Sequence, residues 1–168
     1  MHRYDDCMGP GPKSGAGGPV NPVVNGVATP YHSSVQRLKT YVVEDSAVIR
    51  ENLIATLQEL SAVTVVGWAE DEYTATRWLT QTDNDADLVI IDIFLRSGSG
   101  LGVLQDAAAA PRRRKMVVLS NYATPEMRRK CLALGADRLF DKSTELDALL
   151  LYCDRLALGG DSAPSGMT

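Results

Sequence analysis

The sequence offers little from which a disulfide framework, a zinc site or a membrane segment could be built. It has 168 residues, of which three are cysteine and two are histidine. Cys7, Cys131 and Cys153 are odd in number and show no paired spacing, which disfavours disulfides and structural zinc and fits a reducing cytoplasm. No apolar run approaches the roughly 20 residues of a membrane span, and the N-terminus lacks the apolar core of a secretory signal. We therefore expect a soluble, cytoplasmic protein that does not bind membranes.

Aromatic residues are also scarce (6%), and the formal net charge is −4. The basic run Arg112–Lys115 has no interleaved aromatic residues, so we interpret it as a solvated loop and expect no direct DNA binding. His2 and His32 lie outside the predicted domain, and we expect neither to act as a metal ligand or a base.

Glycine and proline are concentrated near the ends of the chain. The stretch from Gly9 to Pro30 has few large apolar residues and cannot bury enough surface to offset its chain entropy. We therefore predict a disordered leader over residues 1–36 and a flexible tail over residues 159–168. The remaining 37–158, about 120 residues, have the size of one ordinary domain.

Strand-like and helix-like segments alternate through this domain. Apolar runs predict strands at 38–43, 63–68, 88–91, 116–120 and 138–141. Apolar residues spaced by three or four predict helices after each strand, with Ser46, Thr124 and Ser143 as N-caps and Gly135 as a helix end. Strict alternation of this kind implies a parallel sheet that helices cover on both faces.

Polar residues stand where four of the predicted strands end. Glu44 and Asp45 follow the first strand, Asp92 the third, Ser120 ends the fourth, and Lys142 follows the fifth. Because open parallel sheets bind ligands beyond the carboxyl ends of their strands, we expect one site at this edge.

Three carboxylates gathered at one edge repel each other. One pair at about 4 Å and an effective dielectric near 20 costs on the order of 4 kcal/mol. A bound cation would relieve this repulsion. Hard oxygen ligands without histidine or cysteine favour Mg²⁺.

With these residues in order, residues 38–158 resemble the receiver domain of bacterial two-component response regulators. The resemblance assigns Glu44 and Asp45 to the acidic pair, Asp92 to the phosphoacceptor, Ser120 to the switch hydroxyl and Lys142 to the lysine of that family. Gly100-Leu101 and Gly135-Ala136-Asp137 match its turns. It implies an α/β, flavodoxin-like, doubly wound (βα)5 fold with a five-stranded parallel sheet of order 2-1-3-4-5.

The resemblance also implies a function. A sensor histidine kinase or phosphotransfer protein would donate a phosphoryl group to Asp92, with Mg²⁺ held by Glu44, Asp45, Asp92 and the backbone carbonyl of Phe94. The output would be a contact with a downstream protein through the fourth helix, fifth strand and fifth helix. We expect a stand-alone signalling protein, not an enzyme, that is a monomer or a phosphorylation-dependent dimer.

The chain departs from the family pattern at several positions. Leu139 replaces the usual switch aromatic, and strand alternation points the adjacent Phe140 to the other face. Arg96 replaces a frequent proline. Phe94 and Tyr122 lie two residues beyond the phosphoacceptor and the switch hydroxyl. We interpret their bulk as a shield against water, which predicts a long-lived phosphorylated state.

Three other functions use a similar fold or a similar residue pattern. A phosphorylation-independent scaffold or docking module is the main alternative, because the same fold serves both. A haloacid-dehalogenase-type phosphatase needs a second acid two residues after its nucleophile, where this chain has Phe94. A dinucleotide-binding enzyme needs a glycine-rich first turn, where this chain has Glu44-Asp45-Ser46.

Overall fold

The computed structural model describes residues 36–160. Almost all of the predicted leader, with His2, His32 and Cys7, and residues 161–168 of the predicted tail lie outside this range. Within it, strands and helices alternate as the sequence predicts. The strands are β1 (Leu38–Val43), β2 (Val63–Ala69), β3 (Leu88–Ile91), β4 (Lys115–Ser120) and β5 (Arg138–Asp141). The helices are α1 (Ala47–Leu60), α2 (Glu72–Thr80), α3 (Gly100–Ala108), α4 (Pro125–Ala133) and α5 (Leu146–Ala157).

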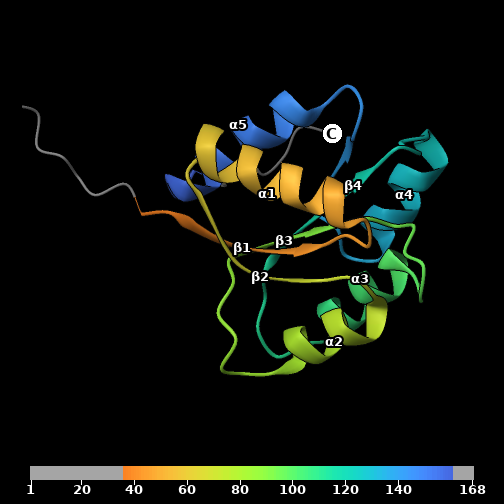
Figure 1. Ribbon diagram of the computed structural model, residues 1–168. Helices are drawn as coiled ribbons and strands as arrows, with labels where there is room; N and C mark the ends of the chain where they lie inside the picture. The colour runs from red at the N-terminus through yellow and green to blue at the C-terminus, as the bar shows by residue number, and fades with distance from the viewer. Residues whose placement is uncertain (1–35, 161–168) are drawn as a thin grey trace, which may run out of the picture. The chain divides into compact units, whose positions relative to one another are not determined.

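The strands form one parallel sheet of order β2-β1-β3-β4-β5, which confirms the predicted fold class. Strands β1 and β3 are neighbours at its centre, although a helix, a strand and another helix separate them in sequence (Figure 1). Their register pairs Val43 with Ile91. The residues that follow, Glu44 and Asp92, therefore leave the sheet side by side.

Helices cover both faces of the sheet, and each face has its own apolar core. Helices α1 and α5 pack on one face, whereas α2 and α3 pack on the other (Figure 1). Helix α4 shares the core of α2 and α3 through its buried Cys131. All four residues of β3 are buried, as expected for a strand covered on both sides. In β5, Leu139 belongs to the α2–α3–α4 core and Phe140 to the α1–α5 core, so the predicted alternation is confirmed.

Two of the three predicted N-caps are confirmed. Ser46 accepts a hydrogen bond from the amide of Ile49, and Thr124 accepts one from the amide of Met127. The prediction for Ser143 is wrong, because its amide and hydroxyl donate to Asp141 Oδ1 and hold it in the turn that follows β5. Helix α5 begins at Leu146, three residues after Ser143.

The basic run is in part the solvated loop that the sequence predicts, because Arg112 and Arg113 are exposed between α3 and β4, but its C-terminal end is not. Arg114 is only partly exposed, and its guanidinium donates to the carbonyl oxygens of Leu79 at 3.0 Å and Asn84 at 2.9 Å. Arg112 pairs with Asp85. These contacts tie the start of β4 to the C-terminal end of α2, so much of the positive charge in this run has a structural role.

The two cysteines that the structure describes, Cys131 and Cys153, are free and buried. Burial raises the pKa of the Cys153 thiol to about 12, which keeps it protonated at neutral pH. Across residues 36–160, no helix combines the length and the apolar character that a membrane crossing requires.

Helix α1 provides a matched test of core packing. Leu57 is fully buried, whereas Leu60, in the same helix, is 65% exposed. We expect Leu57→Ala to lower the free energy of unfolding by about 2–5 kcal/mol, because it leaves a cavity. Leu60→Ala should change it by less than about 0.5 kcal/mol. Urea unfolding followed by circular dichroism measures both, and equal effects would contradict this description of the core.

Candidate functional site

The sheet places the predicted side chains together at its carboxyl edge. The parallel ladder continues one residue past three of the strands. The amide of Glu44 donates to Ala69, that of Asp92 to Val43 and that of Lys142 to Ser120, at 2.9–3.0 Å. The backbones of Glu44, Asp92 and Lys142 are therefore fixed by the last hydrogen bonds of the sheet.

The three acids form a compact cluster. Each of Glu44, Asp45 and Asp92 offers a carboxylate oxygen within 4.8 Å of the other two. Glu44 is 2% exposed and Asp92 is 9% exposed, whereas Asp45 is more accessible. The cluster is therefore buried on one side and open on the other, as a site that exchanges ligands with solvent requires.

Lys142 supplies a positive charge to this cluster. Its ammonium donates to Glu44 Oε2 at 2.6 Å and to Asp92 Oδ2 at 3.0 Å. Burial lowers the pKa of Lys142, but the hydrogen bonds and charges of the two carboxylates outweigh that effect and raise it. The ammonium is therefore charged at neutral pH and compensates part of the negative charge.

The pKa of Glu44 is raised as well, but for a carboxyl group a raised pKa favours the neutral form. Removal from water raises the pKa of its carboxyl group, and the hydrogen bond from Lys142 only partly offsets this effect. The negative charge of Asp92 raises it further. An additional cation at the cluster would favour the ionised form of Glu44.

The cluster fits a hard divalent cation. Its donors are carboxylate oxygens, and no histidine or cysteine contributes to the cluster within residues 36–160. The amide of Phe94 donates to Asp92 Oδ1 at 3.3 Å, which leaves the loop after β3 close to the cluster.

Asp45 is held by that loop. The amide of Arg96 donates to Asp45 Oδ2 at 3.0 Å, and the exposed Arg96 side chain lies 3.8 Å from the same oxygen. A proline at position 96 could not make the shorter contact, because proline has no amide hydrogen. The departure from the family pattern at this position thus adds a bond to the cluster.

Ser120 is fully buried at the end of β4, and its oxygen accepts from the amide of Tyr122 at 3.1 Å. The ring of Tyr122 packs edge-on against Phe94, with centroids 4.9 Å apart. Both rings are about half exposed. They join the loops that follow β3 and β4 beside the carboxylate cluster.

One residue that contacts the site was not predicted. Arg50 in α1 is 5% exposed, and its guanidinium donates to the carbonyl of Glu44 at 2.9 Å and to Glu70 at 3.2 Å, beneath the ring of Trp68. Arg50 thus fixes the backbone of the acidic pair. Its position on the buried stripe of α1, three residues before Leu53, was a usable signal.

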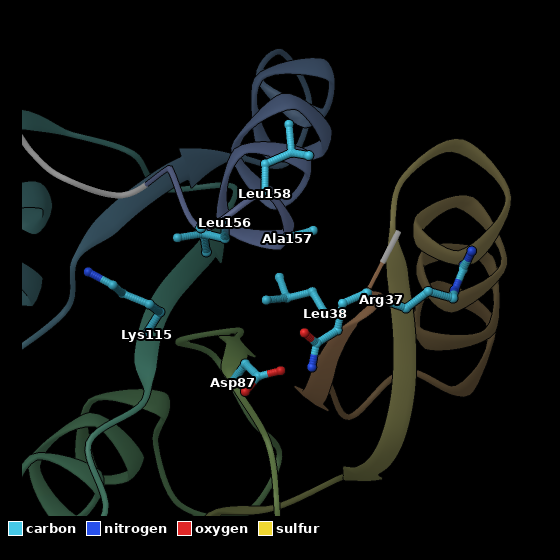
Figure 2. A pocket seen from close by; sticks show the side chains of 9 residues that line it. Arg37, Leu38, Asp87, Lys115, Leu156, Ala157 and Leu158 are labelled. Atoms are coloured by element: carbon cyan, nitrogen blue, oxygen red, sulfur yellow. The ribbon is translucent and has the colours of Figure 1, made fainter. Parts of the chain in front are cut away.

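A cavity of about 530 Å³ opens at the opposite edge of the sheet, where Leu38, Asp87 and Lys115 begin or precede their strands (Figure 2). The end of α5 closes its other side (Figure 2). Two of its charged residues have structural partners. Arg37 donates to the carbonyl oxygens of residues 58 and 63, and Asp87 accepts from the amide of Lys39. The carboxylate cluster is therefore the better candidate for chemistry.

Comparison with known proteins agrees with this architecture. The family model of the response regulator receiver domain matches residues 40–154. The chain belongs to this receiver family. The resemblance to receiver domains and the fold predicted from the sequence are therefore both confirmed. Domains of this family act in signalling.

Individual relatives show how far the likeness extends. A protein-glutamate methylesterase/protein-glutamine glutaminase of Myxococcus xanthus is 30% identical over 128 residues, which are 76% of this chain and 35% of that protein. The chain thus spans about a third of this relative's length.

Two solved structures share the receiver fold. The response regulator domain of Thermotoga maritima CheB superposes with a TM-score of 0.63 at 20% identity, over 74% of this chain and 98% of that one. A Burkholderia pseudomallei response regulator with a phosphorylated aspartic acid and a calcium ion gives 0.59 at 20%, over 73% and 69%.

The raised pKa of Glu44 makes stability depend on pH. Between the ordinary value of 4.5 and the raised folded value, the folded protein binds this proton more readily than the unfolded chain does. This contribution to stability is therefore lost as pH rises through that window. We expect the free energy of unfolding of the wild type, relative to Glu44→Gln, to fall as pH increases from 4.5.

Urea unfolding in EDTA across this pH range measures the effect, with Glu59→Gln, which replaces an exposed glutamate in α1, as the control. If the Glu44→Gln and Glu59→Gln differences showed the same pH dependence, the burial argument for Glu44 would be wrong.

Proposed function

We propose that this receiver, residues 37–158, accepts a phosphoryl group on Asp92 from a phosphohistidine of a sensor histidine kinase or phosphotransfer protein. The observation that carries the proposal is the convergence of two further carboxylates, those of Glu44 and Asp45, on the buried Asp92, which is hydrogen-bonded to Lys142. A purely structural acid gains nothing from two further acids within 4.8 Å.

The chemistry assigns a part to each described side chain. An oxygen of Asp92 forms a bond to phosphorus as the P–N bond of the donor breaks, and the electron pair of that bond leaves with the histidine. Phe94 and Lys142 hold the two carboxylate oxygens of Asp92 in a fixed orientation before the reaction. Lys142 is also positioned to stabilise charge on the transferred group, and positioning of this kind supplies much of phosphoryl-transfer catalysis.

The proposed cation is Mg²⁺, held by Glu44, Asp45, Asp92 and the backbone carbonyl of Phe94. When bound, it would neutralise the phosphoryl oxygens and the acidic cluster together. The Burkholderia fold neighbour, with its phosphorylated aspartic acid and calcium ion, supports the pairing of such a cation with an acyl phosphate.

The proposed output begins at Ser120. Its hydroxyl would turn toward a phosphoryl oxygen and donate to it, and this reorientation would give up the position in which its oxygen now accepts from the amide of Tyr122. That exchange would move the loop between β4 and α4 and alter the α4-β5-α5 face, where Leu132 and Leu151 are more than half exposed. These exposed leucines suit contact with a downstream protein or a second phosphorylated copy.

Phosphate transfer tests the proposal directly. Incubation with a radiolabelled small phosphodonor and Mg²⁺ should label the wild type, whereas Asp92→Asn should lose essentially all label, because an amide is not a nucleophile for this transfer. EDTA should reduce labelling by at least about a hundredfold, since the uncompensated acids then repel the donor. A folded wild-type protein that takes up no label would leave the scaffold function in its place.

The aromatic pair predicts a slow loss of the phosphate. Phe94 packs against Tyr122 and offers no polar group to orient an attacking water. We expect Phe94→Asn to speed dephosphorylation by up to about a hundredfold, the lower end of what a positioned polar group contributes to proton transfer. The decay of labelled protein after donor removal measures it, and unchanged or slower decay in the variant would refute the shielding.

A further inference from the structure

The loop between β3 and α3 carries two groups of the proposed site. Phe94 would supply its carbonyl, and the amide of Arg96 already donates to Asp45 at 3.0 Å. The base of the loop is closed by the amide of Gly100, which donates to Ile93 at 2.9 Å, and by an isolated antiparallel bridge between Phe94 and Ser99. The conformation of this short loop therefore decides how the site is arranged.

The first residue of α2 holds this loop from outside. Glu72 Oε2 accepts from the amide of Ser99 at 2.7 Å, and the amide of Glu72 donates to the carbonyl of Ser97 at 3.2 Å. The two contacts lie on either side of Gly98 and join segments more than twenty residues apart. They connect α2 to Ser99, which is bridged to Phe94, and to Ser97, which follows Arg96.

Two glycines make room for this glutamate. A Cβ on Gly98, whose φ is +80°, would lie 2.4 Å from Glu72 Cβ, and one on Gly102 would lie 2.1 Å from Glu72 Oε1. Any side chain at either position would displace the carboxylate. Ser99 is also the N-cap of α3, so the carboxylate lies at the positive end of that helix.

Glu72 is not needed to cap its own helix. Asp71 performs that task, because its carboxylate accepts from the amide of Thr74 at 2.7 Å. The side chain of Glu72 is directed at the β3–α3 loop instead.

We propose that Glu72 is a positioning residue for the phosphoacceptor loop. By holding Ser97 and Ser99, it fixes the Phe94 carbonyl and the Arg96 amide, and it thereby sets how well Asp45 and Phe94 are arranged for a divalent cation. This inference rests on the proposed function for its metal readout, but its effect on the loop belongs to the metal-free protein.

The test compares Glu72→Ala with Glu72→Gln, which removes the charge but keeps an oxygen that accepts from Ser99. In the metal-free proteins, Glu72→Ala should speed amide hydrogen exchange over residues 94–99 by about tenfold, the change expected on losing one hydrogen bond to a charged group. Glu72→Gln should stay closer to the wild type. Glu59→Ala, which removes an exposed glutamate from α1, should change nothing in the loop.

Calorimetric titration with Mg²⁺ gives the second readout. Glu72→Ala should weaken binding about tenfold, the lower end of what residues that orient metal ligands contribute, and Glu72→Gln should retain most of the affinity. Equal weakening in both variants would point to charge alone and overturn the proposal, as would wild-type exchange and affinity in Glu72→Ala.

Gly102→Ala keeps the test decisive if Glu72→Ala does not fold. Its methyl group would press on Glu72 Oε1 and displace the carboxylate without removing it. We expect faster loop exchange here too, and wild-type exchange would count against the proposal. If the wild type bound no Mg²⁺ and accepted no phosphate, the proposed function would fail, while the metal-free exchange data would still decide the role of Glu72.

Discussion

The ammonium group of Lys142, hydrogen-bonded to both Glu44 and Asp92, is the interaction on which this site depends. Without it, three acids at the edge of one sheet would face each other with no internal counter-charge, and burial makes such repulsion more costly than it is in water. The lysine follows β5 and the acids follow β1 and β3, so their meeting requires that the sheet from β1 to β5 has formed. Charge balance and tertiary structure therefore support each other, and the chemistry is available only to the folded domain.

The strand order explains why the acids meet at the centre of the sheet. Strands β1 and β3 are neighbours because the chain reverses the direction in which it adds strands after β2, and open sheets bind ligands at such a reversal. Glu44 and Asp92 follow paired residues and need no unusual loop to approach each other. The loops after β3 and β4 supply the Arg96 amide and the rings of Phe94 and Tyr122 around them, and the end of β4 supplies the buried Ser120.

The sequence predicted what depends on short-range pattern, namely the elements, their alternation, the opposite faces of Leu139 and Phe140, and the polar residues at the strand ends. It failed where contacts are long-range or where two local motifs compete. Serine is a residue type that N-caps favour, yet the amide of Ser143 donates to Asp141 and Ser143 does not cap α5. Arg114 belongs to a basic run that pattern alone places in solvent, but its guanidinium donates to the carbonyl oxygens of Leu79 and Asn84, 35 and 30 residues away. Arg50 lies on the buried stripe of α1, but its bond to Glu70 joins residues 20 positions apart and could not be read from the pattern. Glu72 gave no signal because its partners lie 25 to 30 residues downstream.

The hydrogen bond from Arg114 to the carbonyl of Leu79 restrains the C-terminal end of helix α2. Short helices ordinarily unravel from their ends, where backbone groups lack partners. Here the last turn is fastened by a guanidinium 35 residues away, and the first turn by the loop after β3. Neither end is loose, so this helix should tilt or shift as a stiff rod rather than melt. A displacement of the loop after β3 would then be transmitted along α2 to Arg114, just before the start of β4.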